Sequence, residues 1–126
     1  MSREDWLSRQ IINAAIEVHR HLGPGLLESA YEHCLYTELI NHGLRTERQQ
    51  ALPVVYKGQR IDCAYRLDLV VEEKVIVELK AVNRLEPVHQ AQMLTYLKLS
   101  GCRLGLLFNF NTPVLKHGIK RIVMNL

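Results

Sequence analysis

Two acidic residues and a lysine lie inside neighbouring apolar segments of this chain. Asp68 lies within one run of β-forming residues, and Glu78 and Lys80 interrupt the next. Burying a charge costs free energy unless it is paired, solvated or bound to a metal. Two carboxylates favour Mg²⁺ or Mn²⁺, and a lysine beside them can stabilise charge that develops on a phosphodiester. The three residues therefore suggest a metal-dependent phosphodiesterase.

The turn between the two segments decides whether these side chains can meet. Along 61–71 the odd positions form the apolar face, which leaves Asp68 on the even face. Glu78 and Lys80 share the less apolar face of the second segment. A three-residue turn at 72–74 places Asp68 opposite Glu78, with Cβ atoms about 5 Å apart. The alternative is a hairpin with ordinary solvated charges, which the bare Asp-x₉-Glu-x-Lys pattern fits equally well.

The central motif resembles that of a known family. Asp68 and Glu78-Leu79-Lys80 are similar to the Asp and (Asp/Glu)-x-Lys elements of the PD-(D/E)xK nuclease superfamily, although Leu67 stands where the proline is expected. The resemblance covers nearly the whole chain, from about Ile11 onward. It implies a restriction-endonuclease-like fold and hydrolysis of nucleic acid, with DNA the expected substrate.

Two flanking motifs extend the resemblance. Gln92-Met-Leu-Thr-Tyr96 resembles the Gln-xxx-Tyr element of the RecB-like exonuclease branch. Gly25-Leu-Leu-Glu28-Ser-Ala-Tyr31 is similar to the Gly-xx-Glu-xx-Tyr signature of a small prokaryotic family within the superfamily. Each short motif is weak alone, whereas their order along the chain is specific.

The resemblance implies a role for each matching residue. The implied metal ligands for Mg²⁺ or Mn²⁺ are Asp68, Glu78, Leu79 and Glu28. The implied catalytic set is Glu28, Asp68, Glu78, Lys80 and Gln92. The implied substrate contacts are Tyr31, Tyr96, His89 and Arg66.

Each flanking motif also has a purely structural interpretation. Glu28 follows a Gly-Pro-Gly stop, so it can simply complement the dipole of a new helix. Tyr31 lies one turn on and can be a core aromatic. Gln92 and Tyr96 share a stripe that can be the solvated side of an amphipathic helix. His89 near a helix start is more often structural than functional.

Composition indicates one compact domain, residues 1–126. The chain is 48% apolar, enough for one core, and has no repeat or Pro-rich linker. Its polar start and short apolar runs predict a cytoplasmic protein with no membrane contact.

The thiols of Cys34, Cys63 and Cys102 are scattered along the chain and are expected to be buried in a protein of a reducing compartment. The net charge of +3 permits nucleic-acid binding without requiring it. Basic residues flank the acidic pair in sequence: Arg45, Arg48, Lys57, Arg60, Arg66, Lys80 and Arg84.

Periodicity predicts an α/β sandwich with a mixed central sheet flanked by helices. The expected helices cover 6–21, 26–42 and 86–100. The expected strands cover 46–56, the catalytic hairpin, 103–110 and 119–124, with a turn at 57–59.

Two other functions stay open at this level. The first is a nuclease-derived module that binds nucleic acid without cleaving it. The second is an accessory subunit whose site is completed by a partner protein or a second copy of the chain. An intact set of Glu28, Asp68, Glu78 and Lys80 favours cleavage over both.

Overall fold

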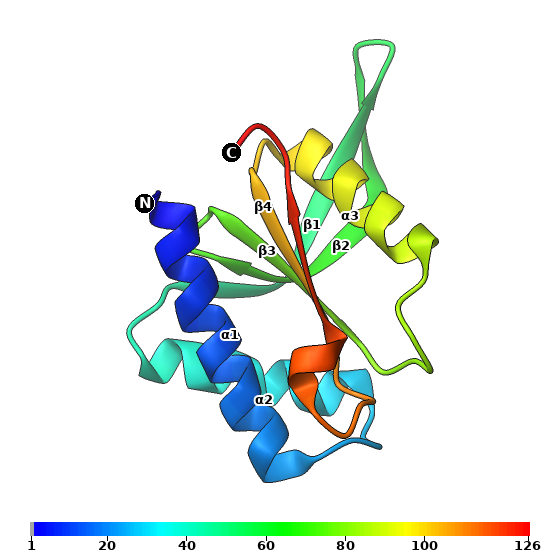
Figure 1. Cartoon of the computed structure of the whole chain (residues 1–126). Helices are drawn as coiled ribbons and strands as arrows, with labels where there is room; N and C mark the ends of the chain where they lie inside the picture. The colour runs from blue at the N-terminus through cyan, green and yellow to red at the C-terminus, as the bar shows by residue number, and fades with distance from the viewer. Residues whose placement is uncertain (1) are drawn as a thin grey trace.

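The protein is built on one five-stranded mixed sheet with helices on both faces (Figure 1). The computed structural model describes residues 2–126, except for the side chains of Cys63 and Ala64. The strands follow one another across the sheet in chain order, and only β3 and β4 are parallel. Their bounds are β1 Thr46–Tyr56, β2 Gln59–Val71, β3 Val75–Lys80, β4 Leu104–Asn109 and β5 Ile119–Val123. This confirms the predicted fold class.

Three helices begin and end where local capping chemistry allows. They are α1 Arg3–Leu22, α2 Glu28–Asn41 and α3 Pro87–Ser100. α1 begins three residues earlier than the apolar periodicity predicts, because Ser2 and Asp5 form a capping box there. α3 begins with proline at its first position and ends at Gly101 in a left-handed conformation. A short 3₁₀ helix, η1 Leu115–Gly118, was not predicted.

The sheet separates two apolar layers. On one face the larger core cluster joins α1 and α2 to the sheet through residues such as Val75 and Val77. On the other face α3 packs against a second cluster that includes Ile76 and Leu107. β3 is therefore buried on both sides, as expected for a strand next to a parallel crossover. α3 is the crossover between β3 and β4.

The hairpin of β2 and β3 has the predicted register. Val71 pairs with Val75 and Leu69 with Val77 across a three-residue turn. Glu72 and Glu73 adopt positive φ there, and the Lys74 N–H donates to the Val71 carbonyl. A two-residue turn is therefore excluded.

The strict alternation predicted for β2 is wrong in its first half. Leu67 belongs to the α3-side cluster, whereas Leu69 and Val71 belong to the opposite one. Ile61 and Tyr65 are exposed, because the far ends of β1 and β2 project from the body as a two-stranded arm (Figure 1). Tyr65 still contacts Tyr96 of α3, whereas the tip of the arm lies away from the helices, so alternation there does not report a core. The side chain of Cys63, part of the same pattern, lies outside the described residues.

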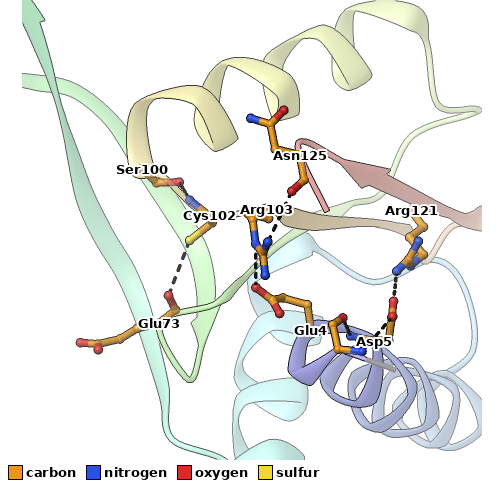
Figure 2. Close-up of polar contacts among 9 residues, drawn as sticks. Glu4, Asp5, Glu73, Ser100, Cys102, Arg103, Arg121 and Asn125 are labelled. Atoms are coloured by element: carbon orange, nitrogen blue, oxygen red, sulfur yellow. Dashed lines mark hydrogen bonds and ion pairs between the residues drawn. The ribbon is translucent and has the colours of Figure 1, made fainter.

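Ion pairs fasten α1 to the end of the sheet where β4 begins (Figure 2). Arg103 donates to Glu4 at 3.3 Å, and Arg121 of β5 pairs with Asp5.

The expectation of buried thiols is wrong for two of the cysteines. Cys102, which lies beside these ion pairs, is only half-buried, and Cys34 is exposed. In residues 2–126 no helix combines the length and apolar character needed to cross a membrane.

Tyr31 fixes the loop that leads into α2. Its side chain is fully buried and stacks on Phe110, with ring centroids 4.3 Å apart. Its hydroxyl donates to the Gly23 carbonyl at 2.6 Å and accepts from the Leu26 N–H at 3.1 Å. One side chain thus satisfies two backbone groups of the Gly-Pro-Gly loop.

Tyr31→Phe is expected to destabilise the fold. It leaves the two loop groups at Gly23 and Leu26 without their partner, at a cost of about 1–3 kcal/mol. Thermal unfolding should show a fall in Tm of several degrees. Tyr36→Phe on the same helix is the matched control, because the Tyr36 ring is half-buried beside Arg48 and its hydroxyl has no hydrogen bond within residues 2–126. Equal Tm values for the two variants would contradict a role for the Tyr31 hydroxyl.

Candidate active site

Asp68 and Glu78 meet where β2 and β3 separate. The backbone ladder of this pair ends at Leu69 and Val77. Beyond it, the Asp68 N–H donates to Glu78 Oε2 at 2.8 Å, and the Leu79 N–H donates to Asp68 Oδ2 at 2.9 Å. Each carboxylate thus accepts a backbone N–H from the other strand. We call this reciprocal arrangement of Asp68 and Glu78 the carboxylate latch.

Burial makes the latch unfavourable in its fully charged form. Glu78 is 4% exposed, and desolvation together with the nearby Asp68 charge raises its pKa to about 8. Desolvation also raises the pKa of Asp68, and the Leu79 N–H opposes that rise. A carboxyl with such a pKa keeps its proton at neutral pH unless a cation neutralises the pair.

Lys80 lies on the same face as Glu78, two residues further along β3. Its side chain is half-buried, and its charge lowers the pKa of both latch carboxyls. Lys80 forms no direct ion pair within residues 2–126. Its ammonium is therefore close enough to lower the pKa of Asp68 and Glu78, although it forms no direct ion pair with either carboxylate.

Glu28 reaches the end of β3 from the first turn of α2. Its Oε1 accepts from the Ala81 N–H at 3.2 Å, and its charge contributes to the raised pKa of Asp68. The structural interpretation of Glu28 as a partner of its own helix dipole is therefore incomplete. Its carboxylate links α2 to the backbone that follows Lys80.

Sequence reasoning missed Glu32 and Gln49. Glu32 is 7% exposed, accepts from Gln49 Nε2 at 2.6 Å and from Arg48 Nε at 3.3 Å, and raises the pKa of Asp68. Its spacing of four residues from Glu28 places both acids on one side of α2, a signal that was available. Gln49 gave no such signal.

An irregularity in β1 lies opposite Asp68. β1 pairs Arg48 with Leu69 and Gln50 with Leu67, and the ladder omits the pair between them. Gln49 has φ of 53°, a left-handed conformation that costs free energy for a residue with a side chain. The distortion turns the Gln49 amide toward Glu32.

α3 contributes Tyr96 to the other side of the latch. Tyr96 is buried, its ring contacts Tyr65 edge-on with centroids 5.4 Å apart, and its pKa is raised to about 12 by burial and then by the charges of Glu78 and Asp68. Gln92 lies one turn earlier on the same stripe and is half-buried, without a hydrogen bond within residues 2–126. The side of α3 that carries Gln92 and Tyr96 is therefore only partly exposed to solvent, because it faces the sheet at Tyr96.

Three of the expected substrate contacts have structural partners. Tyr31 is fully buried and both hydrogen bonds of its hydroxyl go to the loop before α2, so it has no free polar atom to offer. His89 caps α3, with Nδ1 accepting from the Glu86 N–H at 2.9 Å. Arg66 is exposed and donates to the Gln49 carbonyl at 3.1 Å. The geometry favours positioning roles for Tyr31 and His89.

Most of the flanking basic residues have local acidic partners. These pairs are Arg45 with Glu73, Arg48 with Glu32, Arg60 with Asp62 and Arg84 with Glu86. Sequence proximity to the acidic pair therefore overstated the positive charge available to a substrate.

The oxygen donors at the latch suit a hard divalent cation. Mg²⁺ usually binds one or two protein carboxylates and keeps several waters. The Leu79 carbonyl adds a third oxygen, because it lies on the same side of β3 as the N–H that reaches Asp68. Among the side chains that the structure describes, which leave out Cys63, no three of His, Cys, Asp or Glu are grouped closely enough to hold a metal. Glu28 is thus not brought into direct contact with the pair.

One protein-family profile matches most of this chain. Neither curated proteins nor solved structures gave a match. The sequence profile of the PD-(D/E)XK nuclease superfamily matches residues 5–122, a span that includes every helix and strand discussed above except the ends of α1 and β5. The mixed sheet, the crossover through α3 and the acidic hairpin are consistent with the restriction-endonuclease-like fold of that superfamily. The chain belongs to the PD-(D/E)XK nuclease superfamily.

Proposed function

We propose that this protein is a Mg²⁺- or Mn²⁺-dependent nuclease that hydrolyses phosphodiester bonds, with DNA as its substrate. The observation that carries the proposal is the carboxylate latch, a buried acidic pair with Lys80 beside it. Membership of the superfamily implies nuclease activity with a divalent metal in general terms. The residue roles below are our own assignment.

Asp68, Glu78 and the Leu79 carbonyl are the proposed metal ligands. A divalent cation held there supplies Lewis acidity and lowers the pKa of bound water. Each latch carboxylate uses one oxygen for a backbone N–H, which leaves the other oxygen of Asp68 and of Glu78 directed away from that bond. The backbone bonds keep both carboxylates in place before the cation arrives.

Lys80 is the proposed catalytic lysine. Because it has no ion-pair partner in residues 2–126, its ammonium can orient a water or stabilise charge on the phosphate as the bond breaks. Glu28 is proposed to act through a water, since its carboxylate is anchored at Ala81 rather than at the pair. Gln92 and Tyr96 are proposed to contact the substrate backbone.

The Gly-xx-Glu-xx-Tyr motif supports a finer assignment, to the small prokaryotic family with that signature. In this chain the Tyr31 hydroxyl bonds the backbone of the loop before α2, where Gly25 adopts positive φ, and Glu28 accepts from the Ala81 N–H at the end of β3. The spacing of the motif thus places the Tyr31 hydroxyl against the loop that contains Gly25 and places Glu28 at the end of β3.

Lys80→Ala should abolish cleavage while leaving the fold intact. Removing a group that stabilises transition-state charge is expected to lower kcat by about 10²-fold or more. The assay is a panel of single-stranded, duplex, branched and RNA substrates with Mg²⁺ or Mn²⁺, stopped by EDTA. Lys98→Ala is the control, an exposed lysine in the last turn of α3. Undiminished cleavage by the Lys80 variant would refute the assignment, and binding without cleavage by wild type would favour a non-cleaving binding module.

Metal should stabilise the wild type and not Asp68→Asn. A ligand that binds only the folded state contributes about 1.4 kcal/mol when it is about tenfold above Kd. In a thermal melt the wild type should gain several degrees with millimolar Mn²⁺. The variant should lose most of this response, and its metal-free Tm should equal or exceed that of wild type because the pair repulsion is removed. A lower metal-free Tm with no Mn²⁺ response in wild type would mean that the two acids are structural.

Glu78 should make metal-free stability fall as pH rises. Its folded pKa of about 8 lies above its ordinary value of 4.5, so the folded state holds the proton more tightly than the unfolded state. The resulting stabilisation is complete below about pH 4.5 and is lost progressively as pH rises to about 8. Chemical denaturation in EDTA should show this decline in wild type. Glu78→Gln should lack it, and parallel pH profiles for the two proteins would contradict the raised pKa.

A further inference from the structure

A pocket lies on the sheet face that carries Glu78 and Lys80. It has a volume of about 280 Å³ and opens between the loop after β3 and the segment from η1 into β5. All of the titratable side chains that line it are bases: Arg84, His117 and Lys120. We call these three residues and the space between them the basic pocket.

Strand register connects the basic pocket to the latch. Glu78 pairs with Leu107, and Leu107 pairs with Lys120, so the three residues form one row across β3, β4 and β5. Leu107 belongs to the α3-side cluster, and cross-strand partners share a face. Two strand spacings put Lys120 about 10 Å from Glu78 along this row. In the next row, Lys80 pairs with Asn109, which lines the pocket.

The walls of the basic pocket are held in place by Asn109. This residue is 1% exposed, donates to the Val82 carbonyl at 2.9 Å and accepts from the Val82 N–H at 3.1 Å, which fixes the loop that carries Arg84. Gly118 packs directly on the Asn109 backbone, where an added Cβ would lie 2.3 Å from the carbonyl oxygen. Only glycine allows this approach, which brings His117 and Lys120 beside Asn109.

The charge in the basic pocket is only partly neutralised. Arg84 pairs with Glu86 at 2.9 Å. His117 and Lys120 are exposed and form no ion pair within residues 2–126. A lysine ammonium and N–H donors without an opposing acid in the lining favour an anion. The pocket also lies beyond the carboxyl ends of parallel β3 and β4, where α/β sheets commonly bind ligands.

We propose that the basic pocket binds a phosphate of the substrate strand, displaced from the phosphate that is cleaved at the latch. This inference rests on the proposed nuclease function and assigns Lys120 as a positioning residue for the nucleic-acid backbone. Lys120 would set the direction in which the strand crosses the sheet edge, from Lys80 toward β5. It would contribute affinity without reading sequence, because phosphate contacts carry no base information.

The test compares binding by two single variants in EDTA, where the proposed metal-dependent cleavage cannot occur. Fluorescence anisotropy would measure the Kd of a labelled single-stranded oligonucleotide for wild type, Lys120→Ala and Lys116→Ala. Lys116 is a matched control, because it is an exposed lysine of η1 that does not line the basic pocket. Lys120→Ala should raise Kd several-fold and lower the slope of log Kd against log salt by about 0.7. Lys116→Ala should change neither as much.

A set of oligonucleotides, each with one neutral methylphosphonate at a different position, identifies the contacted phosphate. At one position the neutral group should weaken wild-type binding and leave Lys120→Ala unaffected, which measures the coupling between lysine and phosphate. In cleavage assays Lys120→Ala should raise KM more than it lowers kcat. The phosphate site at Lys120 would be refuted if the two lysine variants had equal effects, or if no methylphosphonate position were coupled to Lys120. Either result would leave the nuclease assignment intact. A wild type that does not bind any oligonucleotide would overturn the phosphate site, and a wild type that does not cleave with Mg²⁺ or Mn²⁺ would overturn the nuclease assignment.

Discussion

The structure depends on how two carboxylates are held between separating strands. Asp68 and Glu78 replace the backbone ladder where β2 leaves β3, and each accepts one N–H from the opposite strand. These bonds favour the charged forms, but desolvation is the larger effect and raises both pKa values. The metal-free site therefore holds a proton where a cation would fit. The proposed affinity for a divalent metal and the cost of burying two acids are consequences of the same geometry.

The surrounding elements keep this costly pair from rearranging. β3 is covered on both faces and bordered by β4, so Glu78 cannot turn into solvent without disrupting the sheet. Glu32 lies behind Asp68 and is held by Arg48 and by Gln49, whose backbone adopts an unfavourable conformation. Irregular strand positions of this kind recur beside active sites, because they redirect a side chain that a regular strand would point elsewhere. Local strain in β1 thus supports a network that reaches Asp68.

The sequence predicted the hairpin and the helices because their signals are local. Alternation along β3 and the three-residue turn determined the facing of Asp68 and Glu78, and the capping residues bounded α3. The interaction between Gln49 and Glu32 could not be predicted, since it joins residues from separate elements and requires a left-handed glutamine. Alternation also failed for Ile61, which is exposed, because period-two patterning says which residues share a face and not whether a helix covers that face. The full burial of Tyr31 depends on Phe110, which is distant in sequence.

The contacts in Figure 2 join the first helix to the last two strands of the sheet, since Glu4 meets Arg103 and Asp5 meets Arg121. During synthesis, the hairpin that carries Asp68 and Glu78 leaves the ribosome before β4 and β5 do. Until β4 adds to the sheet, β3 is an edge strand, and Glu78 is hydrated and ionises like any surface glutamate. The raised pKa of Glu78 therefore depends on the burial that the assembled sheet provides. A nascent chain of this architecture therefore buries its acidic pair late, when β4 and β5 add to the sheet and bring Arg103 and Arg121 to α1.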